Sequence, residues 1–353
     1  MRFPLSLLCS MTYYLCGRRF FGGGRFPLVL MLEPLHACNL HCSGCGRIRE
    51  YSDVLSSYLS VDDCIDSVVS CGAPIVSICG GEPLLYSGLL ELVERALRLG
   101  KHIYLCTNGQ LLESKLSEFC LLAASNSRVK RRLYWNVHLD GAAKTHDLIV
   151  GKSGAFDIAM NGIKAAKKAG FLVYTNTTLY KQTSVDELVE LAVELERVGA
   201  DGMMLAPGYG YDAVRGERDK KNGESEGDFF LTRSDIGEKF RELRVRLRRF
   251  RVTATPVFWD FLCGERSLSC AAWANPTRNI KGWKAPCYLV TDTHYETYEK
   301  FINSTDWSKI GYGNDPRCEN CMMHCGYEPA AVLYANKISD LIRLTLWQLG
   351  IVN

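Results

Sequence analysis

The sequence predicts an α/β fold, a partial (β/α)6 barrel of the TIM type followed by a small cysteine-rich metal subdomain. Three observations lead to this prediction. Six short apolar runs alternate with helix-period segments along the chain. The composition is ordinary for a globular protein of 353 residues, with 47% hydrophobic and 23% charged side chains. Sixteen cysteines are present, and tight clusters among them are typical of metal ligands rather than of disulfides.

The composition also excludes several classes of protein. A formal net charge of +3 is too small to indicate a nucleic-acid partner. No apolar run reaches the roughly 20 residues that a membrane span needs. The apolar N-terminal segment, residues 1–25, resembles a signal peptide but lacks a small-residue cleavage site, so we expect a short helix that lies on the barrel or on a membrane surface.

Buried parallel strands are predicted wherever a short run is rich in Val, Ile, Leu or Tyr. Strands that alternate with helices pair in parallel through right-handed crossovers, and ligands then bind at the carboxyl ends of the strands. The six predicted strands cover residues 27–33, 74–79, 102–107, 133–139, 172–179 and 202–206.

Local signals define the helices between these strands. Capping boxes are predicted at Ser60 with Asp63 and at Ser184 with Glu187, because a hydroxyl and a carboxylate three residues apart satisfy each other's backbone N–H groups. Gly72 ends the first of these helices. The other two predicted helices cover residues 89–97 and 155–170.

The division of the chain follows from these patterns. We expect the barrel over residues 26–252, with a mobile polar loop at 210–229, and the cysteine-rich subdomain over residues 253–353. A helix after the loop has apolar positions from Ile236 to Phe250 and arginines at most other positions. Its basic side indicates a solvated face, and a contact with anionic lipid headgroups is the alternative.

The most specific motif directly follows the first predicted strand. Cys38, Cys42 and Cys45 form a C-x3-C-x2-C spacing, in which three thiolates can hold three irons of a [4Fe–4S] cluster and leave the fourth iron open. A zinc site is the alternative, with His36 or His41 as the fourth ligand. The spacing and its position in a (β/α) chain resemble the radical S-adenosylmethionine (SAM) superfamily.

A second motif supports this resemblance at the end of the next strand. The segment Gly80-Gly81-Glu82-Pro83 resembles the superfamily segment that binds the methionine amino group of SAM. The glycines permit close backbone approach, and Glu82 can accept a hydrogen bond from an ammonium group. Alone, the segment would indicate only a turn.

Two polar residues near later strand ends are implied as further SAM contacts by the resemblance. Asp140 and Asn176 match positions at which the superfamily usually contacts the ribose or the carboxylate of SAM, although Asp140-Gly141 also fits a simple turn. The chain departs from the superfamily at Gly44, where an aromatic residue commonly lies beside the adenine.

A narrower resemblance concerns the reaction. Five segments are similar to the hopanoid-biosynthesis radical enzymes, which form adenosylhopane. This implies a radical SAM adenosyltransferase that joins the 5′-deoxyadenosyl group to the alkene of diploptene, a hopene, through a new carbon–carbon bond. The five segments are residues 27–35, 71–85, 102–113, 273–289 and 305–328.

Such an addition leaves a carbon radical that needs a hydrogen atom. Cys106 lies at the end of the third predicted strand, and the resemblance implies that its thiol is the donor. The alternative is a small buried hydrophobic residue, which is the usual role of a lone cysteine in an apolar strand.

A second group of cysteines lies near the C-terminus. Cys318, Cys321 and Cys325 form C-x2-C-x3-C, and Cys287 precedes them. Four thiolates suffice for a structural zinc or for an auxiliary [4Fe–4S] cluster, and His324 or Cys270 could replace one of them.

The expected partners follow from this chemistry. They are an apolar polycyclic hydrocarbon as substrate, a one-electron donor of the flavodoxin or ferredoxin type, and a peripheral membrane contact, with no nucleic acid. A reducing compartment is expected for a cluster protein, so we expect a cytoplasmic location, with the inner membrane surface as a peripheral site. The alternatives are a radical SAM enzyme that modifies a peptide or another small molecule, and a non-catalytic zinc-binding module.

Overall fold

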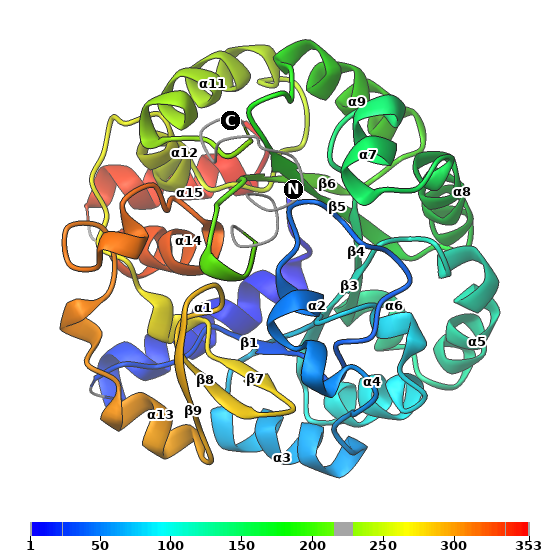
Figure 1. The fold of residues 1–353 in the computed structure, drawn as a ribbon, viewed down its shortest axis with the longest axis horizontal. Coiled ribbons are helices and arrows are strands. Elements are labelled where there is room, and N and C mark those ends of the chain that lie inside the picture. The colour runs from blue at the N-terminus through cyan, green and yellow to red at the C-terminus, as the bar shows by residue number, and fades with distance from the viewer. Residues whose placement is uncertain (1, 23, 215–228, 336, 352–353) are drawn as a thin grey trace.

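One nine-stranded sheet forms the centre of the computed structural model, which describes residues 2–22, 24–214, 229–335 and 337–351. The strands follow the order β6-β5-β4-β3-β2-β1-β7-β8-β9, and β1 to β6 pair in parallel. They coincide with the six predicted strands, so the partial TIM-like barrel is confirmed (Figure 1). These strands are β1 (Val29–Leu32), β2 (Ile75–Ile78), β3 (His102–Thr107), β4 (Leu133–His138), β5 (Leu172–Leu179) and β6 (Gly202–Pro207).

The two predicted capping boxes are both present. The Ser60 hydroxyl accepts the Asp63 N–H at 3.0 Å at the start of α3 (Val61–Cys71), and Ser184 and Glu187 begin α9 (Val185–Arg197) in the same way. The remaining helices of the barrel are α4 (Leu89–Arg98), α5 (Leu112–Ser125), α6 (Val129–Arg132), α7 (Ala143–Val150) and α8 (Ala155–Lys168).

The C-terminal third continues the barrel sheet, which the sequence analysis did not predict. β7 (Thr277–Asn279) pairs in parallel with β1, and β8 (Gly282–Pro286) and β9 (Thr291–Tyr295) follow in antiparallel order. Trp283, Phe301 and Tyr327 of this region belong to the main hydrophobic core. The cysteine-rich part is therefore anchored by a shared sheet and a shared core.

That core fills the space between the parallel strands and the helices around them. Trp135 of β4 packs edge-on against Phe119 of α5, with ring centroids 4.7 Å apart, and both side chains are fully buried. Burial of such large rings stabilises the fold in proportion to the apolar area removed from water. The sheet is thus held rigidly, which fixes the positions of the strand ends.

The arginine-rich helix is α11 (Arg233–Arg246), and residues 215–228 of the predicted mobile loop lie outside the described residues. Arg244 contacts Glu265 at 2.9 Å and Arg246 contacts Asp186 at 2.7 Å. These two arginines therefore bind carboxylates of the chain itself, as expected for a solvated face.

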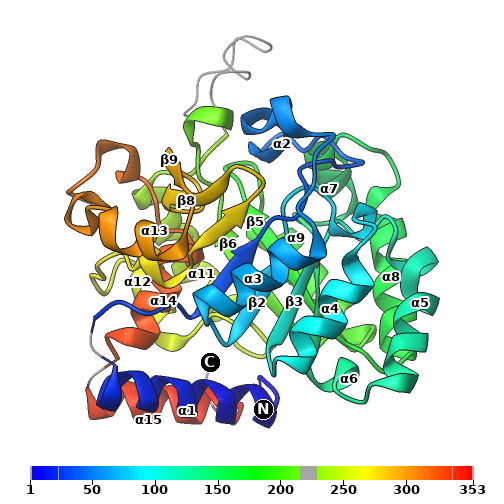
Figure 2. The ribbon, with the colours of Figure 1, turned by 90° about the horizontal axis from the view of Figure 1, so that it is seen from below.

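Two terminal helices lie together on one side of the barrel, far from α2 (Arg47–Glu50) (Figure 2). They are α1 (Leu5–Phe21) and α15 (Ile338–Gln348). The first packs on the barrel as expected, because Leu7 lies in one cluster with Ile75, Tyr134 and Tyr174. Within the described part of the chain, no helix combines the length and apolar character needed to cross a bilayer.

The last part of the chain adds three further helices. They lie on the same side of the barrel as β7 to β9, where α12 packs against α14 and α13 packs against β8 and β9 (Figure 1). These helices are α12 (Pro256–Leu262), α13 (Tyr298–Ser304) and α14 (His324–Leu333).

Candidate active site

The three cysteines of the first motif gather in the loop that follows β1. The Cys45 N–H donates to the Cys42 carbonyl at 3.1 Å, which closes a turn around the second and third thiols. Burial raises the pKa of Cys38 to about 11, and it also raises the pKa of Cys42, on which the charges of both other thiols act in the same direction. Such mutual repulsion between thiolates is offset when they bind cationic iron. The donor set therefore suits an iron–sulfur cluster.

The glycine segment packs directly on the chain that leads to these cysteines. The Gly81 N–H donates to the Leu35 carbonyl at 3.0 Å, and the Glu82 N–H donates to the Ala37 carbonyl at 2.8 Å. A Cβ atom on Gly81 would overlap the Ala37 carbonyl, and Gly80 adopts φ 110°. Both glycines are thus required by close approach and by backbone conformation.

The Glu82 side chain is fixed by three hydrogen bonds from neighbouring residues. Its carboxylate is 1% exposed and accepts the Thr107 hydroxyl at 2.8 Å, the Asn108 N–H at 2.8 Å and the Leu84 N–H at 3.0 Å. Burial raises the pKa of Glu82, while these three bonds oppose that increase. A carboxylate has about four acceptor positions, so one further donor can be accommodated. Pro83 begins the short 3-10 helix that follows.

Asp140 and Asn176 lie near the same end of the sheet. Asp140 is fully buried, accepts the Thr178 N–H at 2.7 Å and pairs with the His138 ring at 2.6 Å. Burial lowers the pKa of His138, but the Asp140 carboxylate reverses this and the pKa is raised overall. Asn176 is half-buried on β5, and its side-chain oxygen has no hydrogen-bond partner among the described residues. Asn176 is therefore better placed than Asp140 to meet a ligand.

An aromatic residue that the sequence analysis missed lies beside the cluster loop. A Cβ atom on Gly44 would overlap the Tyr180 ring, so this tyrosine occupies the space next to the residue before Cys45. The ring is 4% exposed and stacks on Phe229 with a centroid distance of 4.3 Å. No local pattern links these residues, because they are far apart in the sequence.

Cys106 lies on the inward side of β3 between two polar neighbours. Its sulfur is 3.4 Å from the Ser77 hydroxyl and 3.6 Å from the Asn136 amide nitrogen. Burial raises the pKa of Cys106, although both neighbours oppose this. The side chain therefore remains a protonated thiol at neutral pH, which is the form that can give up a hydrogen atom.

Besides the Cys106 thiol, the Glu328 carboxyl of α14 is an ionisable group near β3. Its carboxylate accepts the Thr255 N–H at 3.3 Å and acts electrostatically on Tyr104 of β3. Burial raises the pKa of Glu328 to about 7. The sequence analysis did not single out this residue, because its neighbours come from distant segments.

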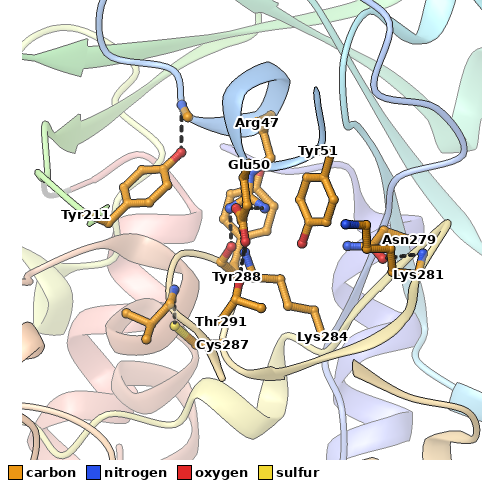
Figure 3. Close-up of polar contacts among 12 residues, drawn as sticks. Arg47, Glu50, Tyr51, Tyr211, Asn279, Lys281, Lys284, Cys287, Tyr288 and Thr291 are labelled. Carbon is orange, nitrogen blue, oxygen red and sulfur yellow. Dashed lines mark hydrogen bonds and ion pairs between the residues drawn. The ribbon is translucent and has the colours of Figure 1, made fainter. Parts of the chain in front are cut away.

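A buried ionic network joins the cluster loop to β8 and β9 (Figure 3). Arg47 follows the third cysteine by two residues and is 3% exposed. Its guanidinium lies 3.6 Å from Glu33 and 3.3 Å from Glu50, with Cζ 4.4 Å from the Tyr288 ring centroid. Lys284 of β8, also fully buried, donates to Glu50 at 3.0 Å. The loop that carries the cysteines therefore rests on the C-terminal third.

The C-terminal cysteines line one small cavity of about 20 Å³. The four predicted ligands are all there, and Cys270 joins them with its sulfur against the Gly326 backbone of α14. All sixteen cysteines of the chain are free of disulfides. The predicted ligands of this second site are Cys287, Cys318, Cys321 and Cys325.

Among the residues that the structure describes, no three or more His, Cys, Asp or Glu side chains are spaced to share one metal ion. A zinc ion needs ligand atoms close to one centre, whereas a four-iron cluster binds each thiolate at a different iron.

Comparisons with known proteins agree with this geometry. Residues 32–195 match the model of the radical SAM superfamily, and residues 203–343 match a domain of unknown function, DUF3463. The chain is 32% identical to an AdoMet-dependent heme synthase of Methanosarcina barkeri over 63% of this chain and 61% of the relative. It is 31% identical to the mycofactocin maturase MftC of Mycolicibacterium smegmatis over 49% of this chain and 43% of the relative. The chain thus spans less than two thirds of these relatives.

The fold is also similar to a solved structure. The FeFe-hydrogenase maturase HydG of Carboxydothermus hydrogenoformans superimposes with a TM-score of 0.52 at 13% identity, covering 98% of this chain and 80% of that one. At this identity the likeness concerns the fold alone.

Proposed function

Because residues 32–195 make this chain a member of the radical SAM superfamily, we propose that it cleaves SAM reductively at a [4Fe–4S] cluster held by Cys38, Cys42 and Cys45. The observation that carries the proposal is the contact between the cysteine loop and the glycine segment, through the hydrogen bonds of Gly81 and Glu82 to the chain before Cys38. When bound, the reduced cluster and SAM supply a 5′-deoxyadenosyl radical, which can take a hydrogen atom or add to an alkene.

The residues around the cluster loop suit SAM in distinct ways. The backbone of Gly80 and Gly81 lies close to the loop, and Glu82 keeps one acceptor position for an ammonium group. Asn176 offers an amide oxygen without a hydrogen-bond partner among the described residues. Asp140 orients the His138 ring through their ion pair. We propose that Tyr180 supplies the aromatic surface for adenine that Gly44 lacks.

Cys106 is proposed as the hydrogen-atom donor. Addition of a carbon radical to a terminal alkene forms one carbon–carbon bond and leaves an unpaired electron on the more substituted carbon. The S–H bond is weaker than the C–H bond formed, so Cys106 can pass its hydrogen atom to that carbon. The resulting thiyl radical then needs one electron, from a flavodoxin- or ferredoxin-type donor, and one proton.

Two substrate classes compete for this machinery. The relatives are named as heme synthases and as maturation proteins. These names favour a reaction on a tetrapyrrole or a peptide. Formation of adenosylhopane from diploptene rests on the five sequence segments and on the partly buried thiol of Cys106 on β3. The comparisons favour the first class, and the second is supported by the sequence resemblance, which implies Cys106 as the hydrogen-atom donor.

An anaerobic assay separates these classes. The reconstituted chain is incubated with SAM, dithionite and either diploptene, a porphyrin precursor or no substrate, and the products are identified by mass spectrometry. If the chain is a radical SAM enzyme, 5′-deoxyadenosine is expected to be released in all of these incubations. An adduct of diploptene and the adenosyl group would support the hopanoid reaction. Turnover of the porphyrin precursor without such an adduct would support a reaction on a tetrapyrrole.

Substitution of the thiol tests its role. Cys106→Ala should still release 5′-deoxyadenosine but should lose the saturated product, whereas Cys120→Ala, a cysteine of α5 outside the barrel interior, should behave as wild type. Undiminished saturated product in Cys106→Ala would remove the donor assignment.

The second cysteine group is proposed to hold an auxiliary [4Fe–4S] cluster. Five thiols surround the cavity, so every iron of such a cluster could have a protein ligand, which favours electron transfer or a structural role over substrate activation. Iron analysis should give about eight irons per wild-type chain and about four in Cys287→Ser with Cys321→Ser. A stoichiometry of one zinc and four irons would contradict the proposal.

A further inference from the structure

We propose that α1 and α15 together form a docking surface for an anionic lipid bilayer. Both helices lie on the side of the molecule opposite α2 and the cluster loop (Figure 2). The N-terminal segment and α15 are joined where the Arg2 N–H donates to the Gln348 carbonyl at 3.0 Å and Phe3 packs on Trp347 at 5.8 Å. The two helices are therefore one continuous feature rather than two independent ends.

The outward side of α1 carries large apolar side chains and has no charged residue before Arg18. Leu5, Leu8, Tyr13 and Phe20 are 57%, 39%, 85% and 79% exposed, and the exposed positions between them are Cys9, Thr12, Cys16 and, in the last turn, Arg19. A helix on the surface of a globular protein normally turns charged side chains outward. In α1 the inward side is apolar as well, since Leu7 packs beneath the barrel. Before Arg18, both sides of this helix are therefore without charged side chains.

The outward side of α15 repeats this pattern. Ile338, Leu341 and Ile342 are 77%, 51% and 54% exposed at helical spacing on one face, and Leu349, directly after the helix, is 51% exposed. The opposite face is buried through Trp347 and through Asp340, which pairs with Arg266 at 2.8 Å. The only carboxylate of this helix is thus turned away from the exposed apolar row.

Exposed patches of this kind mark an interaction site. Ten of the nineteen large apolar side chains that are exposed in the described residues belong to α1 or to the segment 334–351. When an apolar helix face has basic residues beside it, its side chains insert into the boundary between the lipid headgroups and the acyl chains. The apolar row alone does not decide between a bilayer and a protein partner.

Charge decides between them. No Asp or Glu occurs in the chain before Glu33, whereas Arg18, Arg19 and Arg25 lie at or after the end of α1. The neighbouring α6 adds a further basic group, and it adjoins α1 through the contact between Ser6 and the Arg131 carbonyl at 3.5 Å. The exposed basic residues of this group are Arg128, Lys130 and Arg131.

This basic border complements an anionic surface and opposes self-association. Each Lys or Arg near an anionic leaflet contributes about 1 kcal/mol to binding. A second copy of the chain placed on the same surface would bring arginines against arginines, because the first 32 residues hold no carboxylate and Asp340 of α15 is already paired with Arg266. The favoured occupant is therefore a bilayer that contains anionic lipid.

Vesicle flotation of the full chain tests the proposal. Binding is expected to vesicles of phosphatidylglycerol mixed with phosphatidylcholine, and weaker binding to phosphatidylcholine alone. Leu341→Glu with Ile342→Glu should reduce partitioning roughly tenfold, because two inserting side chains become anionic. Arg128→Glu with Arg131→Glu should reduce binding to the anionic vesicles only.

A matched control is available on the other side of the molecule. Leu148 of α7 is 71% exposed, so Leu148→Glu changes the same chemistry away from the docking surface and should leave partitioning unchanged. All variants should release 5′-deoxyadenosine as wild type does, which separates this proposal from the proposed reaction. Failure of the wild-type chain to float, or equal flotation of Leu341→Glu with Ile342→Glu, would overturn it. Concentration-dependent dimerisation that the same variant abolishes, without vesicle binding, would assign the surface to a second copy instead.

Discussion

Replacing Arg47 by Met should destabilise the fold far more than the loss of an ordinary arginine. The side chain is 3% exposed, and its guanidinium is the nearest cation to the fully buried Glu33. Glu33 would then lose its closest cation, and Lys284, which pairs directly with Glu50, would offset its buried charge only from a greater distance. Removal of one partner from a buried pair costs about 3–5 kcal/mol.

The geometry supports the upper part of this range. Arg47 also contacts Glu50, donates to the Tyr288 carbonyl and lies 4.4 Å over the Tyr288 ring, so methionine would forfeit two charge contacts and a hydrogen bond at once. Lys284 remains beside Glu50 and limits the damage there. For a chain of 353 residues, 3–5 kcal/mol corresponds to a fall in Tm of about 4–7 °C.

The assay is thermal unfolding followed by circular dichroism, at matched iron content for all variants. Arg98→Met is the control, because Arg98 is 68% exposed on its side chain and pairs only with Glu94 on the same helix. Such surface pairs contribute about 0.3–0.5 kcal/mol, so its Tm should move by no more than about 1 °C.

A double substitution distinguishes a buried charge from lost packing. Glu33→Gln with Arg47→Met removes both charges, and it should recover part of the stability that Arg47→Met loses. A Tm of Arg47→Met within about 2 °C of wild type would refute the reasoning, because it would mean that Glu33 does not depend on this cation.

Two further predictions concern the glycine segment and the carboxyl of α14. Gly81→Ala should lower both Tm and iron content, since the new Cβ would overlap the Ala37 carbonyl; a variant with wild-type iron content would contradict the contact. Burial raises the pKa of Glu328 to about 7, above its usual value of 4.5, so the folded state binds more protons than the unfolded state between these pH values and stability falls as pH rises through this window. Glu328→Gln should therefore raise stability at pH 8 by roughly 3 kcal/mol relative to wild type and change it little at pH 4.5; denaturation curves at the two pH values, with equal changes at both, would disprove this.

Local patterns in the sequence were sufficient for the parallel part of the fold. The six barrel strands are short apolar runs, and the caps at Ser60 and Ser184 depend on residues only three positions away. The cysteine triad and the glycine segment could be recognised for the same reason. Each is contiguous, and each directly follows a strand.

Features that depend on distant pairing could not be predicted. β7 is only three residues long and polar, and it is a strand because β1 offers an unpaired edge. Tyr180 fills the space beside Gly44, and Arg47 meets Tyr288 across most of the chain. No period or spacing reports such contacts, because they are set by the packed structure rather than by the neighbouring residues.

The position of β1 between β2 and β7 has a consequence for biosynthesis. The strand that leads to the three thiols emerges from the ribosome early, yet its second neighbour is residues 277–279, and the Arg47 network needs residues up to 291. The cysteine loop cannot therefore reach its final form during translation of the first half of the chain. Iron delivery to these thiols must wait for the polypeptide to be nearly finished, and a nascent chain stalled before residue 277 should bind the metal poorly.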